Sequence, residues 1–274
     1  MLFRTGSMEK DDRLFEVSKP SIQTRRQDTD PTQLNLRILF NALQTFHTND
    51  ETTSFLKLLV NSKGINIVSF LNAHAVNVAA NNAQFFDVLL SSEYLFRDGI
   101  GSEIGCQLLG ISPGLNLNGT DLIPQIIEEY RGLKVGIIGA KPLWSKIAAK
   151  KLRSQGHIVA AIDGYQPIET YFEFVTNELP DLLVIGMGMP KQELLAQALK
   201  PILLRQGHSC TIVNGGAILD FIAGRVDRAP LWYQRMYIEW VFRLLQEPRR
   251  LGKRYLLGNP AFLWRMINHI RMPN

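Results

Sequence analysis

The sequence predicts an α/β fold in which helices cover a Rossmann-like parallel sheet. Short apolar runs alternate with helical stretches along the chain, and polar or glycine-rich turns follow the apolar runs. This alternation is typical of strand–helix–strand units, whose parallel strands are buried on both faces. Ligands of such sheets bind outside the carboxyl ends of the strands, so we expect the functional residues at these ends.

The chain divides into four predicted regions. Residues 1–30 are polar and charged with little periodicity, which predicts a disordered extension. Residues 31–130 are expected to form a smaller N-terminal α/β region, residues 131–223 a Rossmann-like region, and residues 224–274 a helical appendage. The expected strands are residues 65–71, 93–96, 135–138, 158–162, 182–185 and 211–213.

Composition and length indicate an ordinary globular protein. The chain has 274 residues, of which 46% are hydrophobic and 20% charged, enough for one large domain or two small ones. Its two cysteines, Cys106 and Cys210, lie far apart in apolar sequence, so we expect two buried thiols in a reducing cytoplasm. We expect no signal peptide and no membrane span, since no run of about 18 apolar residues occurs.

The charge is concentrated in the appendage. Residues 224–274 carry a net charge of +7, and the whole chain carries +5, so the remaining residues carry −2. The appendage also holds eight aromatic residues, and basic residues among Trp and Tyr suit an anionic membrane surface. Nucleic acid is the rival partner for such a surface.

Two apolar stripes run along the appendage at helical spacing. Trp232, Met236, Trp240 and Leu244 form the first, which we expect to pack on the protein body. Phe262, Met266 and Ile270 form the second, which we expect to face lipid.

The segment from Pro180 to Glu193 has the layout of an anion site. A buried strand ends at Gly186 and Gly188, and a helix begins at Pro190, a residue that suits the first helical turn. Glycines let the backbone approach a ligand, and the amide groups of a helix N-terminus favour an anion. Lys191 adds a full positive charge. The alternative is an ordinary strand-to-helix turn.

Other strand ends also carry polar residues. Asn72 and Asp98 follow the first two strands; each could bind a substrate or cap the next helix, and Asp98 could also act as a base. Gly139 and Asp163 make half of a dinucleotide fingerprint, which leaves an NAD-dependent oxidoreductase as an alternative. Asp28-Thr29-Asp30 mimics a metal-binding Asp-x-Asp but follows no strand, so we predict no metal site.

Several motifs in order resemble the WecG/TagA/CpsF glycosyltransferases over about residues 65–262. They are Asn72, Arg97–Gly101, Asn118–Leu122, Gly186–Glu193, Gly215–Asp220 and Arg228–Pro230 through Pro248–Arg250. The resemblance implies an inverting bacterial transferase that needs no metal or other cofactor. Its donor would be a UDP-sugar, and its acceptor a polyprenyl-pyrophosphate-linked saccharide at the cytoplasmic face of the membrane. Nucleic acid is then not a partner, and homo-oligomerisation stays open.

The resemblance also assigns residues to roles. The catalytic residues would be Asp98, as general base, with Asn72 and Gln192. The nucleotide-sugar, held mainly by residues 131–223, would contact Gly139, Gly186, Gly188, Pro190, Lys191, Gln192, Glu193, Asn214, Gly215, Gly216 and Asp220. The acceptor or a diphosphate would contact Thr120, Asp121, Arg225 and Arg228, and the membrane Arg235, Arg243, Arg249, Arg250 and Trp264.

Two positions depart from the family pattern. Phe70 stands where the family often has Thr, and Asn116 stands where an Arg is common. Both positions could contact the donor sugar or the acceptor phosphate. The donor expectation therefore includes both UDP-N-acetylmannosamine and UDP-glucose.

Overall fold

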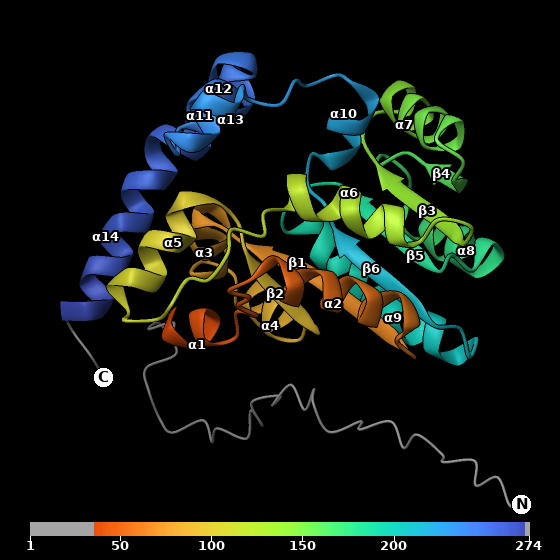
Figure 1. Cartoon of the computed structure of the whole chain (residues 1–274), viewed down its shortest axis with the longest axis horizontal. Coiled ribbons are helices and arrows are strands. Elements are labelled where there is room, and N and C mark those ends of the chain that lie inside the picture. The colour runs from red at the N-terminus through yellow and green to blue at the C-terminus, as the bar shows by residue number, and fades with distance from the viewer. Residues whose placement is uncertain (1–35, 272–274) are drawn as a thin grey trace, which may run out of the picture. The chain divides into compact units, whose positions relative to one another are not determined.

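The computed structural model describes residues 36–271, and within them all six predicted strands form (Figure 1). Each strand agrees with its predicted range to within one residue at either end. Central strands are buried along their whole length, as parallel strands covered on both faces must be. The prediction of a Rossmann-like α/β fold is confirmed. The strands are β1 (Ile65–Leu71), β2 (Tyr94–Arg97), β3 (Lys134–Gly139), β4 (Ile158–Ile162), β5 (Leu182–Gly186) and β6 (Cys210–Asn214).

One parallel sheet contains all six strands, in the order β2-β1-β6-β5-β3-β4. β6 lies between β1 and β5, with Ile65 opposite Cys210 and Leu182 opposite Thr211. The predicted N-terminal and Rossmann-like regions therefore share one sheet. As a result, the carboxyl ends of all six strands line up along a single edge. The predicted extension, residues 1–30, lies outside the described residues.

The helices that connect the strands begin at the residues expected to cap them. Thr48 and Glu51 form a capping box on α2, and the Asn118 side chain accepts a hydrogen bond at the start of α6. The helices of this part are α1 (Leu36–Asn41), α2 (Asn49–Asn61), α3 (Ala73–Ala79), α4 (Ala83–Leu90), α5 (Gly99–Leu108), α6 (Gly119–Glu129), α7 (Pro142–Ser154), α8 (Ile168–Glu178), α9 (Lys191–Arg205) and α10 (Ile218–Ala223).

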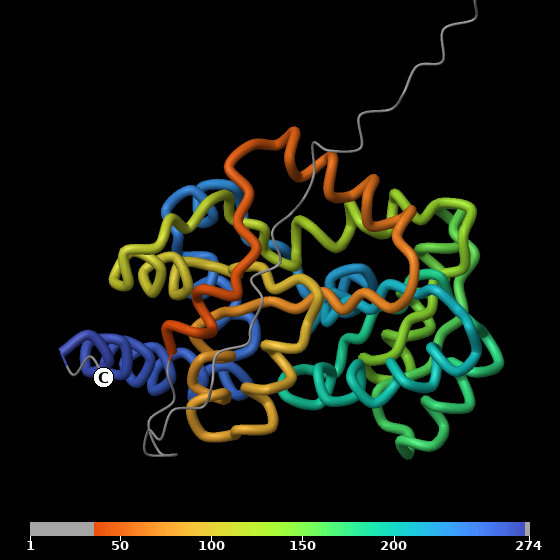
Figure 2. Tube along the Cα trace, turned by 90° about the horizontal axis from the view of Figure 1, so that it is seen from below, coloured from red at the N-terminus to blue at the C-terminus, as the bar shows by residue number. Residues whose placement is uncertain are grey.

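These helices cover both faces of the sheet. One apolar cluster joins the sheet to α2, α6, α7 and α10, and others join its second face to α3, α4, α8 and α9. In Figure 2, α2 lies on one side of the strands and α4 on the other. Both cysteines are buried and unpaired, as predicted, and burial raises their thiol pKa values.

The appendage consists of α11 (Leu231–Arg235), α12 (Glu239–Gln246), α13 (Pro248–Gly252), the π-helix η2 (Lys253–Leu257) and α14 (Gly258–Arg271). Tyr237 has a φ of 59°, a left-handed conformation that interrupts the helix between α11 and α12. The first predicted stripe is therefore not continuous. Trp232 and Met236 are 55% and 61% exposed, so the expectation that this stripe packs on the body is wrong for both residues.

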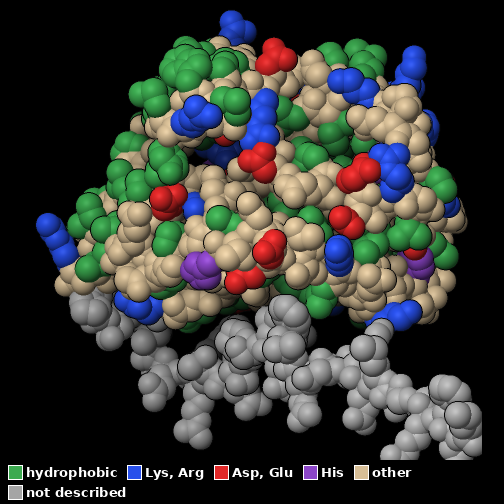
Figure 3. Space-filling model, viewed as in Figure 1, with side chains coloured by type: hydrophobic (Ala, Val, Ile, Leu, Met, Phe, Trp, Pro, Cys, Tyr) green, Lys and Arg blue, Asp and Glu red, His purple; other side chains and the backbone are tan. Residues whose placement is uncertain are grey.

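The second stripe, on α14, packs on the protein body, which is the position that we expected for the first stripe. Phe262 and Met266 of α14 are buried in the cluster that includes Val76 of α3 and Phe85 of α4. The expectation that this stripe faces lipid is therefore wrong for these two residues, whereas Ile270 is 40% exposed. The opposite side of α14 is exposed instead, with Trp264 at 64%. Figure 3 shows apolar side chains gathered over α11–α14.

No helix within residues 36–271 is both long enough and apolar enough to cross a bilayer.

Candidate active site

A cavity of about 870 Å³ lies between the carboxyl ends of the strands and the appendage. The loops after all six strands contribute to its wall, and α12, η2 and α14 close the opposite side. Its volume suits a small-molecule substrate. The edge at which we expected functional residues is therefore the edge that carries the cavity.

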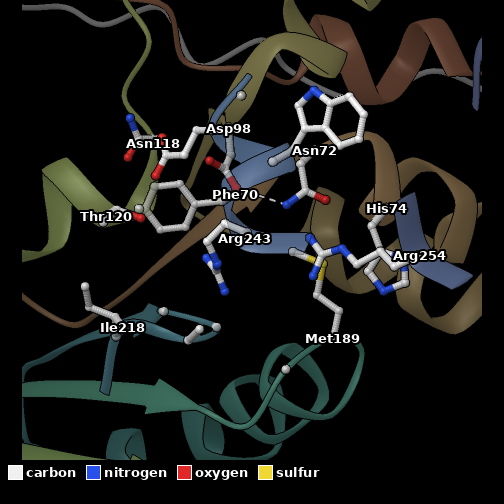
Figure 4. A pocket seen from close by; sticks show the side chains of 18 of the residues that line it. Phe70, Asn72, His74, Asp98, Asn118, Thr120, Met189, Ile218, Arg243 and Arg254 are labelled. Atoms are coloured by element: carbon white, nitrogen blue, oxygen red, sulfur yellow. Dashed lines mark hydrogen bonds between the residues drawn. The ribbon is translucent and has the colours of Figure 1, made fainter. Parts of the chain in front are cut away.

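Asp98 and Asn72 lie together at one end of this cavity. Asn72 Nδ2 donates a hydrogen bond of 3.0 Å to Asp98 Oδ2, and Asn72 Oδ1 accepts one of 3.0 Å from the backbone N–H of Ala75 (Figure 4). Asn72 is thus both a helix cap and a ligand of Asp98. Asp98 occupies the N-cap position of α5 without making the capping hydrogen bond. Its carboxylate is oriented by Asn72 and lines the cavity.

Gln192 connects two of the loops that line the cavity. Its Oε1 accepts hydrogen bonds from the backbone N–H groups of Gly188, at 3.1 Å, and Gly216, at 3.0 Å. Its Nε2 donates to Glu193 Oε1 at 2.8 Å, and the side chain is 1% exposed. The backbone N–H of Gly188 is therefore already bonded to Gln192 in this structure. The catalytic role of Gln192 stays a prediction.

Glu193 lies behind Gln192 and does not line the cavity. The side chain is fully buried, and its Oε2 has no hydrogen-bond partner in the described chain. Burial raises the pKa of Glu193 to about 7, although the hydrogen bond from Gln192 opposes this. Glu193 therefore supports the loop from inside the protein, and its side chain is not exposed in the cavity.

Of the predicted nucleotide-sugar residues, most line the cavity but three do not. Besides Glu193, these are Pro190 and Gly139. A Cβ on Gly139 would lie 2.3 Å from the Gly186 carbonyl oxygen, so this glycine is required for the close packing of β3 on β5. Asn214 does line the cavity, and its buried Oδ1 has no partner in the described chain. The others that line it are Gly186, Gly188, Lys191, Gln192, Gly215, Gly216 and Asp220.

The two arginines expected to reach the substrate are already paired with carboxylates. Arg225 binds Asp220 through two hydrogen bonds of 2.7 and 2.8 Å, and Asp220 raises the pKa of the guanidinium. Arg228 pairs with Asp121, and neither of these two lines the cavity. Hydrogen bonds from Arg228 and Asn118 lower the pKa of Asp121, although burial opposes them. These pairs attach the appendage to the sheet domain.

Two other arginines of the appendage lack carboxylate partners in the described chain. Arg243 lies over the ring of Phe221, 4.7 Å from its centroid, and Arg254 lies in η2. Both line the cavity, and the Nε of each is buried without a hydrogen-bond partner. Burial lowers the pKa of Arg254, while nearby Tyr255 and Asp98 raise it. Arg243 was expected to contact a membrane, and Arg254 was not predicted at all.

His74 and Phe70 complete the wall around Asp98. His74 faces Arg254 in Figure 4, and burial, together with the charge of Arg254, lowers the pKa of His74 to about 4. His74 is therefore neutral at pH 7. The ring of Phe70 lies beside Thr120, which also lines the cavity. Arg250 lines the cavity as well, whereas Arg235, Arg249 and Trp264 lie outside it.

Gly139 and Asp163, the two residues of the half dinucleotide fingerprint, do not line the cavity. Asp163 Oδ1 accepts a hydrogen bond from the Tyr165 backbone, and Oδ2 accepts one from Gln166, so this carboxylate stabilises a turn. The geometry does not favour the oxidoreductase alternative.

Comparison with known proteins agrees with this geometry. The sequence model described as "Glycosyl transferase WecG/TagA/CpsF family" matches residues 37–274. The chain is also 26% identical over 214 residues to the N-acetylglucosaminyldiphosphoundecaprenol N-acetyl-beta-D-mannosaminyltransferase of Bacillus subtilis (strain 168), a match that covers 74% of this chain and 82% of the relative. The chain therefore belongs to the WecG/TagA/CpsF family of glycosyltransferases.

Proposed function

We propose that this glycosyltransferase moves a sugar, with inversion, from a UDP-sugar to a saccharide linked to polyprenyl pyrophosphate. The donor would be of the UDP-N-acetylmannosamine or UDP-glucose type. One observation carries the proposal: Asp98, oriented by Asn72, lies in the same cavity as two arginines that lack carboxylate partners in the described chain. The relative from Bacillus subtilis, whose name specifies a diphosphoundecaprenol acceptor, supports the acceptor class.

Asp98 is the proposed general base. Its carboxylate takes the proton from the acceptor hydroxyl while the hydroxyl oxygen bonds to the anomeric carbon of the donor. The bond from that carbon to the diphosphate breaks at the same time, and UDP leaves with the electron pair. Asn72 holds the carboxylate in place for this step through its 3.0 Å hydrogen bond.

Two diphosphates need positive charge during such a transfer. Lys191, at the start of α9, is placed for the departing UDP, together with the N-terminus of that helix. Arg243 and Arg254, which come from α12 and η2 and also line the cavity, would bind the diphosphate of the acceptor. The Nε atom of each guanidinium is buried without a hydrogen-bond partner in the described chain, and an anionic substrate would supply an acceptor.

The exposed apolar residues of the appendage support a peripheral place on the cytoplasmic face of the membrane. Leu257 and Trp264 are 64% exposed and Leu256 is 62% exposed, close to the basic residues of the appendage. A lipid-linked acceptor is held in the bilayer, so a surface that binds lipid would bring the cavity to it.

A transfer assay tests this function. Purified enzyme is incubated with a polyprenyl-pyrophosphate-linked N-acetylglucosamine and a panel of labelled UDP-hexoses and UDP-N-acetylhexosamines, with and without EDTA. We expect one donor to label the lipid at a rate that EDTA does not change, because side chains and helix termini neutralise the diphosphate. Transfer from none of the panel would contradict the proposed function, and a rate abolished by EDTA would contradict the cation-independent mechanism.

A further inference from the structure

Two buried side chains beneath the start of α9 each lack a hydrogen-bond donor. Oε2 of Glu193 and Oδ1 of Asn214 are both buried, and neither has a partner in the described chain. Glu193 is 0% exposed and Asn214 is 2% exposed, so bulk water does not reach them. A buried acceptor without a donor costs free energy, and each such case needs an explanation.

The strand register places these two side chains on the same face of the sheet. Asn214 ends β6 opposite Ile185 of β5, and Ile185 packs in one apolar cluster with Leu195 of α9. Paired residues of neighbouring strands point to the same face, so the Asn214 side chain points towards α9. Its Nδ2 donates to Ser69 Oγ at 2.9 Å on that face. The first turn of α9, which contains Glu193, follows β5 and covers this point.

A neutral Glu193 would supply the missing donor. Its Oε1 already accepts a hydrogen bond of 2.8 Å from Gln192 Nε2. The orientation of the Gln192 amide is fixed, because its oxygen accepts from the backbone N–H groups of Gly188 and Gly216. A proton on Glu193 Oε2 would make that oxygen a donor, and Asn214 Oδ1 is the buried acceptor on the same face. One proton therefore satisfies both oxygens.

The surroundings of Glu193 favour the neutral form. Burial raises its pKa to about 7, while hydrogen bonds from Gln192 and from its own backbone oppose this. Within the described chain, other titratable side chains on the elements that pack on α9 are exposed, ion-paired or ionise well above pH 7. Asp87, Glu169 and Glu173 are exposed, Glu93 and Glu178 pair with Lys200 and Lys134, and burial raises the pKa values of Tyr171 and Cys210.

We propose that Glu193 is a positioning residue for the donor: as a neutral acid it accepts a hydrogen bond from Gln192 and donates one to Asn214. It thereby holds Gln192 between Gly188 and Gly216, in the loops after β5 and β6. The inference rests on the proposed function, which assigns these loops to the donor diphosphate. An ionised Glu193 cannot donate, so its Oε2 would repel Asn214 Oδ1 and the two loops would lose their common support.

The pH dependence of UDP binding, measured by calorimetry, tests this role. From pH 7 to pH 9 we expect the wild type to lose affinity for UDP about tenfold, because the neutral fraction of Glu193 falls. Glu193→Gln is expected to keep its affinity over this range, since an amide accepts through oxygen and donates through nitrogen at every pH. Glu193→Leu can do neither and is expected to bind UDP about tenfold more weakly than Glu193→Gln at both pH values.

Glu173→Gln is the matched control, because Glu173 is exposed on α8 and lies outside the cavity. This variant should follow the wild type at both pH values. Infrared spectra give a second readout that needs no ligand. At pH 6 we expect the wild type to show the carbonyl band of a protonated carboxyl group that Glu193→Gln lacks. Asn214→Ala is expected to shift this band, because it removes the acceptor.

Each outcome decides one claim. An equal change in UDP affinity with pH in Glu193→Gln and in the wild type would overturn the positioning role. A wild type without the infrared band would also overturn it, because Glu193 would then be ionised and would need a donor from Asn214 instead. Presence of the band in an enzyme that binds no UDP would overturn the proposed function and the role in donor binding, while the bond to Asn214 would stand.

Discussion

Gln192 lines the cavity and also holds two of its loops together, although its side chain is almost fully buried. Its amide oxygen holds the backbone of Gly188 and Gly216, which belong to loops after neighbouring strands. Two N–H donors face that oxygen, so the amide nitrogen must face an acceptor, and Glu193 provides one. The segment Gly186–Glu193, which the sequence predicts to bind phosphate, therefore also holds two loops together through hydrogen bonds inside the protein. Loss of the Gln192 side chain would alter both loops that we assign to the donor diphosphate.

Glu193 makes a pH dependence of stability testable. Its pKa is raised from 4.5 to about 7, so the folded protein binds a proton that the unfolded chain releases between these values. Stability therefore falls as pH rises from about 4.5 to 7, by about 3 kcal/mol at most for this group. We expect Glu193→Gln to remove this contribution, so that the difference in unfolding free energy between variant and wild type changes across this pH range. A difference that is constant from pH 5 to 8 would show that Glu193 is not buried as described.

Residue identities predicted that Asp98 and Asn72 would lie at the same edge of the sheet, but not which arginines would line the cavity. Asp98 and Asn72 follow strands, and a parallel sheet brings strand ends together, so their meeting could be expected. Whether an appendage arginine faces the cavity or a carboxylate depends on the path of the chain between helices. The conformation of Tyr237 and the π-helix around Arg254 set that path, and neither has a sequence signal comparable to an apolar strand.

At the scale of elements, the strands and the appendage differ in how well they could be predicted. A parallel strand buried on both faces is a continuous apolar run, and all six such runs form strands. The appendage helix α14 has apolar residues on two sides: one side packs on the protein body and the other is exposed. Phe262 and Met266 pack inward while Trp264 points outward, and spacing alone does not tell which side is which.

The exposed side of the appendage gives a prediction about membranes. We expect the double variant Leu257→Glu, Trp264→Glu to lose cosedimentation with phosphatidylglycerol vesicles, because two carboxylates would enter the apolar interface. Neither residue lines the cavity, so turnover on a soluble acceptor with a short lipid should be preserved. Leu143→Glu, at the distant exposed position on α7, is the control and should still bind vesicles. Unchanged sedimentation of the double variant would show that another surface binds the membrane.

At the scale of the whole molecule, the proposed function assigns each part of the reaction to a part of the cavity. We assign the donor diphosphate to the loops after β5 and β6, and the donor sugar to the space near Asp98. We assign the acceptor diphosphate to Arg243 and Arg254, and the appendage that carries these arginines also carries exposed apolar residues. In this proposed arrangement the two substrates meet at Asp98, so the reaction depends on this carboxylate more than on any other group.

The most direct measurement compares Asp98→Asn with the wild type in both transfer and UDP binding. Asparagine keeps the shape but cannot take a proton, so we expect transfer to fall by a factor of about 100 to 10,000 with UDP affinity nearly unchanged. Asp227→Asn, an exposed carboxylate of the appendage outside the cavity, should leave both unchanged. Transfer by Asp98→Asn at a rate close to that of the wild type would contradict the account, because the base would then be elsewhere.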